Sequence, residues 1–173
     1  AQIFIKDGYI EAKSNGRLKG CEFYFEIVSV TATENALMAA CLADGTTTLK
    51  NCAREPEVSD LANFLNDCGA QISGIGSDEL TIQGVKQLHG TSFSIMPDRI
   101  ETATYLVATT MTGGEITVRN CQPNSLGAVI KKLEEAGAEI TCGEKEIYLN
   151  MKEDIPKSTS LSTAPFPSFP TDM

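Results

Sequence analysis

Three segments of the chain place acceptor or carboxylate side chains directly before a predicted helix. They are residues 28–33, 95–99 and 169–172. A helix N-terminus exposes free N–H groups and a partial positive charge, so it favours anionic or acceptor-rich ligands. Several such N-termini aimed at one cleft would let an acidic protein hold a phosphorylated substrate. The alternative is that Thr33, Asp98 and Asp172 only cap their helices, which their residue types favour.

The cysteines and the single histidine argue against metal and thiol chemistry in this stretch. No two cysteines have the C-x-x-C spacing and the chain has a single histidine, so we expect no metal site. We also expect no cofactor. His89 lies in a polar turn between strand-like runs and is a poor candidate for a catalytic triad. We interpret the cysteines as small, semi-buried residues of a reducing compartment. They are Cys21, Cys41, Cys52, Cys68, Cys121 and Cys142.

The composition is that of a folded globular protein, with 173 residues, 42% hydrophobic residues and a net charge of −9. Nucleic acids and anionic membranes bind basic faces, so we expect neither as a partner. The sequence shows no signal peptide, and its longest apolar run, residues 36–43, is far too short to span a membrane. These features predict a soluble cytoplasmic protein.

The chain repeats itself with a period of about 69 residues. The matching groups are Gly69-Ala70 with Gly137-Ala138, Asn51-Cys52 with Asn120-Cys121, Gly45 with Gly114, and Leu18-Lys19-Gly20 with Leu88-His89-Gly90. This period is longer than that of a solenoid repeat. Each copy is therefore expected to be a larger block of strands and helices.

Each block is predicted to run strand, helix, strand, helix, strand, strand. In the first copy we expect strands at 22–28, 46–51, 71–73 and 80–83, and helices at 33–42 and 57–68. Thr33 is the candidate N-cap of the first helix, and Gly69 stops the second. The second copy, residues 92–150, repeats this order, with one helix opening at Asp98 and another, 126–136, stopped by Gly137. The crossovers between strands imply an α/β architecture.

Both ends of the chain also match the repeat. Ala1, Gln2 and Ile3 correspond to Ala70, Gln71 and Ile72, residues 158–163 resemble a first strand, and Pro170-Thr171-Asp172 fall where Pro97-Asp98 open a helix. We therefore expect a piece of a longer protein that holds about two units plus partial ends.

Four runs resemble the enolpyruvyl transferases, in particular those that act on UDP-N-acetylglucosamine. They are residues 33–40 (Thr-Glu-Asn-Ala-Leu-Met-Ala-Ala), 53–58 (Ala-Arg-Glu-Pro-Glu-Val), 96–102 (Met-Pro-Asp-Arg-Ile-Glu-Thr) and 169–173 (Phe-Pro-Thr-Asp-Met). The resemblance implies two inside-out α/β barrel domains, each built from three βαβαββ units. It implies that residues 1–96 form the latter part of the first domain and residues 97–173 the first part of the second.

The resemblance also implies a reaction and the residues that serve it. Enolpyruvyl would pass from phosphoenolpyruvate to the 3′-hydroxyl of UDP-N-acetylglucosamine with release of phosphate, the first committed step of peptidoglycan precursor synthesis. Asp172 would bind the sugar hydroxyl and act as its base, and Ser29, Val30 and Thr31 would contact the uridine nucleotide. Where some members carry a lysine two residues before this serine, the chain has Ile27.

Other parts of the family's machinery are expected outside these residues. The resemblance places the catalytic cysteine and the arginines that bind phosphoenolpyruvate elsewhere, so we expect the 173-residue piece to be inactive alone. Two alternatives are a 3-phosphoshikimate 1-carboxyvinyltransferase-like enzyme and a non-catalytic repeat module of the same fold. Faces left open by missing blocks would favour self-association.

Overall fold

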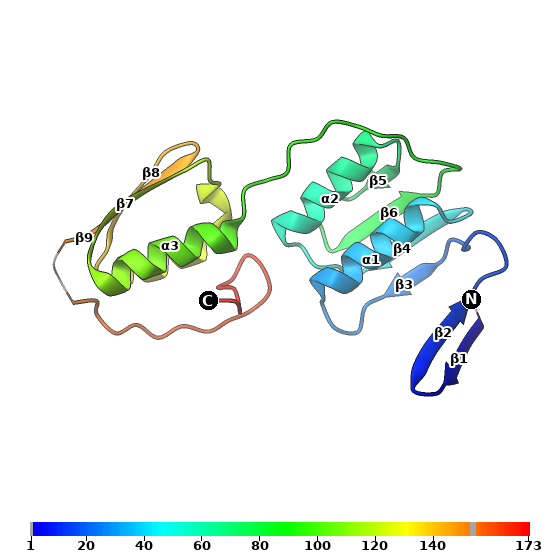
Figure 1. The fold of residues 1–173 in the computed structure, drawn as a ribbon, viewed down its shortest axis with the longest axis horizontal. Helices are drawn as coiled ribbons and strands as arrows, with labels where there is room; N and C mark the ends of the chain where they lie inside the picture. Colours follow the sequence, from blue (N-terminus) through cyan, green and yellow to red (C-terminus); the bar gives the residue numbers. More distant parts are fainter. Residues whose placement is uncertain (1, 153–154) are drawn as a thin grey trace. The chain divides into compact units, whose positions relative to one another are not determined.

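The computed structural model describes residues 2–152 and 155–173 and divides into two compact units, Ala1–Ser94 and Ile95–Met173. Ala1, with which the first of the repeat matches begins, lies outside the described residues. Both units are built from helices packed on a β-sheet, as Figure 1 shows for each. The α/β architecture predicted from the sequence is thus observed.

The first unit opens with a hairpin of β1 (Gln2–Lys6) and β2 (Tyr9–Lys13), paired antiparallel. Its two turn residues, Asp7 and Gly8, both have positive φ angles, of 51° and 81°. An Asp-Gly pair is typical of such two-residue turns, because their twist matches that of the strands. Every described side chain of the hairpin strands is exposed.

The main sheet of the first unit has the strand order β3-β4-β6-β5. Its elements are β3 (Glu22–Tyr24), α1 (Val30–Cys41), β4 (Thr46–Lys50), α2 (Pro56–Asp67), β5 (Gln71–Ser73) and β6 (Glu79–Gln83). The β3 strand pairs parallel to β4, and β6 pairs antiparallel to β4 and to β5. This is the predicted order of strand, helix, strand, helix, strand, strand.

Buried and more exposed side chains alternate along β4 and β6, and this alternation shows which face of the sheet the helices cover. Leu49, Leu80 and Ile82 are buried, while their polar neighbours point to the other side. They join Leu37 of α1 and Ala62 of α2 in one hydrophobic core. The two helices therefore pack on a single face of the sheet and leave the opposite face polar.

In its described residues, 95–152 and 155–173, the second unit repeats this plan without a first strand. It consists of α3 (Arg99–Thr112), β7 (Gly114–Arg119), a 3₁₀ turn η1 (Pro123–Ser125), α4 (Gly127–Glu135), β8 (Glu139–Cys142) and β9 (Glu146–Lys152). Its sheet order, β7-β9-β8, matches β4-β6-β5 of the first unit. Leu106, Val129, Ile147 and Leu149 are the centre of its core.

Matching residues of the two units adopt the same unusual backbone conformations. Asn51 and Asn120 are both left-handed, with φ of 58° and 55°. Gly69 and Gly137 end their helices with φ of 95° and 111°, which a glycine adopts at least cost. The internal repeat found in the sequence is therefore a repeat of structure.

Two strands predicted from the repeat are absent. Residues 91–98 form neither helix nor strand, although the second copy was expected to begin with a strand there. Residues 158–163 contain only an isolated bridge from Thr163 to Phe169. A strand is stabilised by its ladder to a neighbour, and among the described residues nothing pairs with the edge of β7 that corresponds to the β3 side of β4.

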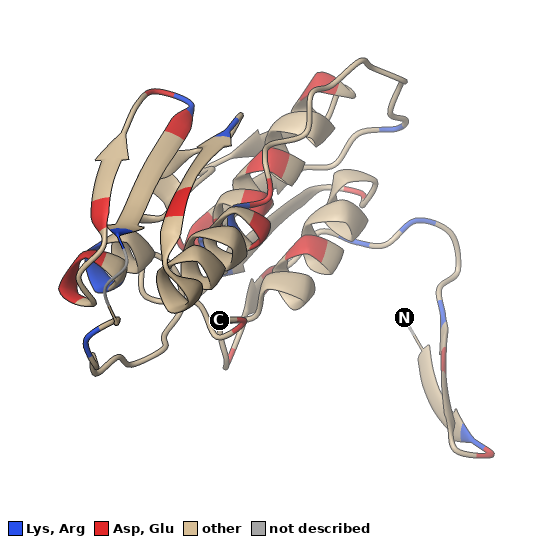
Figure 2. Cartoon of the chain, turned by 60° about the vertical axis from the view of Figure 1, so that its left-hand side comes forward, with Lys and Arg blue, Asp and Glu red and all other residues tan. Residues whose placement is uncertain are grey.

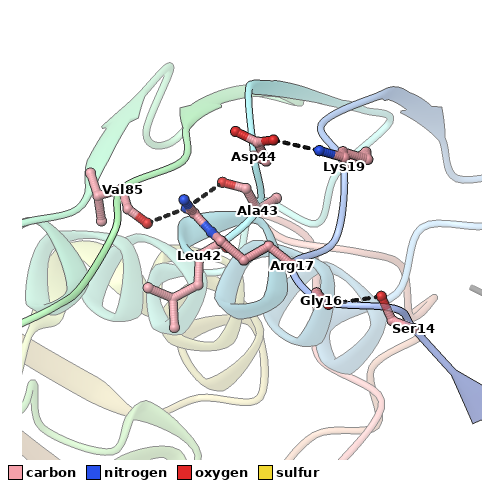
Figure 3. Close-up of polar contacts among 8 residues, drawn as sticks. All are labelled: Ser14, Gly16, Arg17, Lys19, Leu42, Ala43, Asp44 and Val85. Carbon is pink, nitrogen blue, oxygen red and sulfur yellow. Dashed lines mark hydrogen bonds and ion pairs between the residues drawn. The ribbon is translucent and has the colours of Figure 1, made fainter.

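The connection between β2 and β3 is fastened to the C-terminal end of α1 (Figure 3). The Arg17 Nε donates to the Leu42 carbonyl at 2.9 Å, and its Nη2 donates to the carbonyls of Ala43, at 2.8 Å, and of Val85. A cation at this end also complements the helix dipole. Next to it the Lys19 ammonium bonds the Asp44 carboxylate and holds the pKa of that carboxyl below its usual value.

Candidate functional site

The residues predicted to contact a nucleotide lie together at the start of α1. Ser29 is the N-cap, with extended backbone and its Oγ accepting from the Ala32 N–H at 3.3 Å. Val30 and Thr31 form the first turn, where backbone N–H groups have no partner within the helix. Ser29 and Val30 are half-buried and Thr31 is exposed. The sequence thus predicted a loop where the structure has a helix N-terminus.

The prediction that Thr33 caps this helix is wrong, because the helix begins three residues earlier. Thr33 is instead fully buried in the first turn. Its Oγ1 donates to the Ser29 carbonyl at 2.8 Å and accepts from the Ala53 N–H at 3.1 Å. The hydroxyl therefore joins the start of α1 to the segment that follows β4.

Negative charge gathers beside the first half of α1. Partial burial raises the pKa of the Glu34 carboxyl, and the neighbouring carboxylates of Glu57 and Glu55 raise it further. The acidic residues of α1 and of the segment that opens α2 therefore lie close enough to interact.

Asp172 lies in the second unit, in a turn directly after two buried residues, Phe169 and Pro170. Phe169 belongs to the core of this unit, and Met173 packs against the same core. The backbone around Asp172 is thus held on both sides, while its carboxylate is exposed. An exposed carboxylate can accept a hydrogen bond from a sugar hydroxyl.

The second predicted helix start is capped as expected. The Asp98 Oδ1 accepts from the N–H groups of Ile100, at 2.8 Å, and Glu101, at 3.1 Å. The next residue, Arg99, is buried, and its guanidinium lies 5.7 Å from the centre of the Phe166 ring. This cation–π contact holds the loop that leads to Phe169 against α3.

Acidic residues occur on helices and strands alike (Figure 2). No group of three or more His, Cys, Asp or Glu side chains is arranged to hold a metal ion among residues 2–152 and 155–173. Within the same residues no helix has the length and apolarity that crossing a membrane requires.

The cysteine at the end of β4 is expected to resist thiol reagents. Burial raises the pKa of the Cys52 thiol to about 11, so about one molecule in a thousand carries the thiolate at pH 8. We expect iodoacetamide at pH 8 to leave Cys52 unmodified in the folded protein and to alkylate it in urea, with native labelling rising as the pH approaches 11. Peptide mass spectrometry measures this, and equal labelling in both states would contradict it.

Solved structures define the fold class. The enolpyruvyl transferase NikO from Streptomyces tendae matches with a TM-score of 0.70 and 24% identity, over 86% of this chain and 39% of that chain. EPSP synthase from Acinetobacter baumannii matches with a TM-score of 0.62 and 21% identity, over 88% and 37%. The chain therefore has the fold of part of an enolpyruvyl transferase.

The sequence places the chain in a particular family. It belongs to the family of EPSP synthase (3-phosphoshikimate 1-carboxyvinyltransferase), whose family model matches residues 1–173. It is 58% identical over its whole length to a UDP-N-acetylglucosamine 1-carboxyvinyltransferase of Aeromonas hydrophila, and 56% identical to one of Shewanella frigidimarina. The chain covers 41% of each of these two relatives. The resemblance read from the four sequence runs is confirmed.

One residue of the site region escaped the sequence interpretation. Asn51 was recognised as part of a repeated pair and as the end of a predicted strand, yet its side chain also donates to the Phe25 carbonyl, one residue after β3. A signal was present, because this Asn recurs in both copies and Asn is enriched among non-glycine residues with positive φ.

Proposed function

We propose that the full-length protein transfers enolpyruvyl from phosphoenolpyruvate to the 3′-hydroxyl of UDP-N-acetylglucosamine, with release of phosphate. The observation that carries this proposal is the 58% identity over the whole chain to a UDP-N-acetylglucosamine 1-carboxyvinyltransferase. The reaction would begin peptidoglycan precursor synthesis in the cytoplasm. The chain spans about two fifths of the length of that relative, so further residues of the protein complete the site.

The proposed base lies in the second unit, and the proposed nucleotide contacts lie in the first. In the addition step the sugar hydroxyl attacks C2 of phosphoenolpyruvate, its proton passes to a base, and C3 receives a proton from an acid. Loss of phosphate and of one C3 proton then restores the double bond. Asp172 is the proposed base, because the family resemblance assigns that role to the aspartate of the Phe-Pro-Thr-Asp-Met run. Its carboxylate is exposed on a turn held by its neighbours. Ser29, Val30 and Thr31 are the proposed contacts to the uridine nucleotide.

The arrangement of units supports the proposed domain assignment. The first unit contains a full βαβαββ block, and the second contains the same block without its first strand. We assign residues 1–96 to the latter part of the first inside-out barrel domain and residues 97–173 to the first part of the second.

Exposed apolar side chains on β1, β2 and α1, such as Ile5, Ile10 and Met38, support self-association of the isolated chain, which a monomeric sedimentation profile would contradict.

The experiment that tests the function supplies the full-length protein with phosphoenolpyruvate and UDP-N-acetylglucosamine and measures released phosphate. A parallel sample contains shikimate 3-phosphate in place of the sugar nucleotide. We expect release only with UDP-N-acetylglucosamine, and release only with shikimate 3-phosphate would establish the alternative. No release with either would support a non-catalytic module. The isolated 173-residue chain is expected to release none.

A further inference from the structure

Asn51 ties the end of β3 to the end of β4. Its side-chain Nδ2 donates to the Phe25 carbonyl at 2.7 Å, and the Phe25 N–H donates to the Lys50 carbonyl at 3.0 Å. The N–H and the carbonyl of Phe25 are therefore bonded to two consecutive residues, Lys50 and Asn51, at the end of β4. Phe25 is itself buried and is the last fixed point before the segment of residues 26–32, which contains Ser29, Val30 and Thr31.

The C-terminal end of residues 26–32 is connected to the chain that follows β4. The Ala53 N–H donates to the Thr33 hydroxyl, which in turn donates to the Ser29 carbonyl. Thr33 and Ala53 are almost completely buried, so water does not compete for these bonds. Two residues of the same segment, Asn51 and Ala53, thus hold residues 26–32 at both ends.

The left-handed backbone of Asn51 makes this double connection possible. Its φ of 58° turns the chain at the end of β4, and the next N–H, that of Cys52, donates to the Asp78 carbonyl at 2.9 Å. Because β4 lies between β3 and β6, the side chain of Asn51 reaches one neighbouring strand while the following peptide reaches toward the other. Asparagine tolerates this conformation and also supplies the amide donor.

We infer that Asn51 is a positioning residue that sets the conformation of residues 26–32 for ligand binding. The inference rests on the proposed function in one respect, namely that a uridine nucleotide contacts Ser29, Val30 and Thr31. The bond to Phe25 fixes where β3 ends, and the start of α1 follows from that point within a few residues. Asn51 does not itself touch the nucleotide.

Two substitutions separate the amide from the backbone conformation. Asn51→Gly keeps the positive φ at little cost and removes the side chain. Asn51→Asp keeps the size and tolerates the conformation, but its carboxylate cannot donate to the Phe25 carbonyl. The matched control is Asn120→Gly, because Asn120 has a φ of 55° and precedes the equally buried Cys121 in the second unit.

The experiment compares these variants in the full-length protein by amide hydrogen exchange and by calorimetric titration with UDP. Losing one hydrogen bond of this kind is expected to raise the dissociation constant of UDP about fivefold to tenfold in both Asn51 variants. Exchange at the Ala32 N–H, which bonds to the Ser29 hydroxyl within residues 26–32, is expected to accelerate by a similar factor. Asn120→Gly is expected to change neither quantity.

The two readouts distinguish failure of this inference from failure of the proposed function. If the wild-type protein does not bind UDP while the Asn51 variants still accelerate exchange at residues 26–32, the positioning role stands and the nucleotide assignment falls. If the wild type binds UDP and both Asn51 variants bind it equally well with unchanged exchange, the inference is overturned. Faster exchange spread evenly over the first unit would also overturn it, since that pattern reports general destabilisation.

Discussion

Replacing Asp172 by alanine in the full-length protein is expected to lower turnover by about 10²–10⁴-fold, the range over which a positioned base accelerates a reaction. The 3′-hydroxyl of a sugar is a weak acid, so its attack on phosphoenolpyruvate requires that its proton be removed as the bond forms. Asp172 is the residue of this chain that the family resemblance assigns to that proton. Steady-state phosphate release with both substrates measures the loss.

A conservative variant separates binding from base catalysis at this position. Asp172→Asn still hydrogen-bonds the sugar hydroxyl but cannot take its proton, so kcat should fall while KM for UDP-N-acetylglucosamine stays close to that of the wild type. Asp172→Ala should impair both quantities. Glu144→Ala, which removes an exposed carboxylate in the turn between β8 and β9, is the control and should leave both unchanged. Turnover near the wild-type rate in Asp172→Ala would return Asp172 to a structural role.

The repeated block could be predicted from the sequence because its landmarks are local. Gly69 and Gly137 end helices, and Asp98 opens one, through interactions within a few residues of each position. Such signals depend on backbone conformation and on nearby hydrogen bonds, so a single sequence displays them. The same reasoning found the hairpin of β5 and β6, whose pairing needs no distant partner.

The missing strands show where local reasoning ends. Residues 92–95 have a strand-like composition, but a strand forms only when another segment supplies its hydrogen-bond partners. The start of α1 differs from the predicted one for a related reason. Thr33 has the composition of a cap, yet its hydroxyl is used by the Ala53 N–H from beyond β4, and Ser29 takes the cap position instead. Both outcomes depend on contacts distant in the sequence.

The candidate site divides in the same way. The residue pattern placed Ser29, Val30 and Thr31 in a loop near a helix start, whereas the structure makes Ser29 the N-cap and puts Val30 and Thr31 in the first turn. The roles of these residues and of Asp172 came only from the resemblance. The carboxylates around Glu34 could not be foreseen, because Glu55 and Glu57 belong to another helix start more than twenty residues away.

A large stability effect in the first unit is expected at Gly20, where two backbones approach too closely for a side chain. A Cβ at this position would lie 2.2 Å from the Thr46 carbonyl oxygen and 2.7 Å from the Thr46 nitrogen. The neighbouring backbone cannot move aside, because the Gly20 N–H donates to the Asp44 carbonyl and the Asp44 N–H donates to the Leu18 carbonyl. Gly20→Ala must therefore separate the start of β3 from the start of β4.

We expect Gly20→Ala to destabilise the folded first unit by about 3 kcal/mol, at the upper end of the cost of overpacking, and to lower its Tm by roughly 12–24 °C. Separation would also strain the neighbouring bonds of Arg17 and of Lys19 to the end of α1 (Figure 3). The repeat supplies the control: Gly90 is the counterpart of Gly20, and a Cβ there would meet open space. Gly90→Ala should stay within about 0.5 kcal/mol of the wild type. Differential scanning calorimetry of the full-length variants measures both, and equal Tm values would show that the close approach of β3 and β4 relaxes without cost.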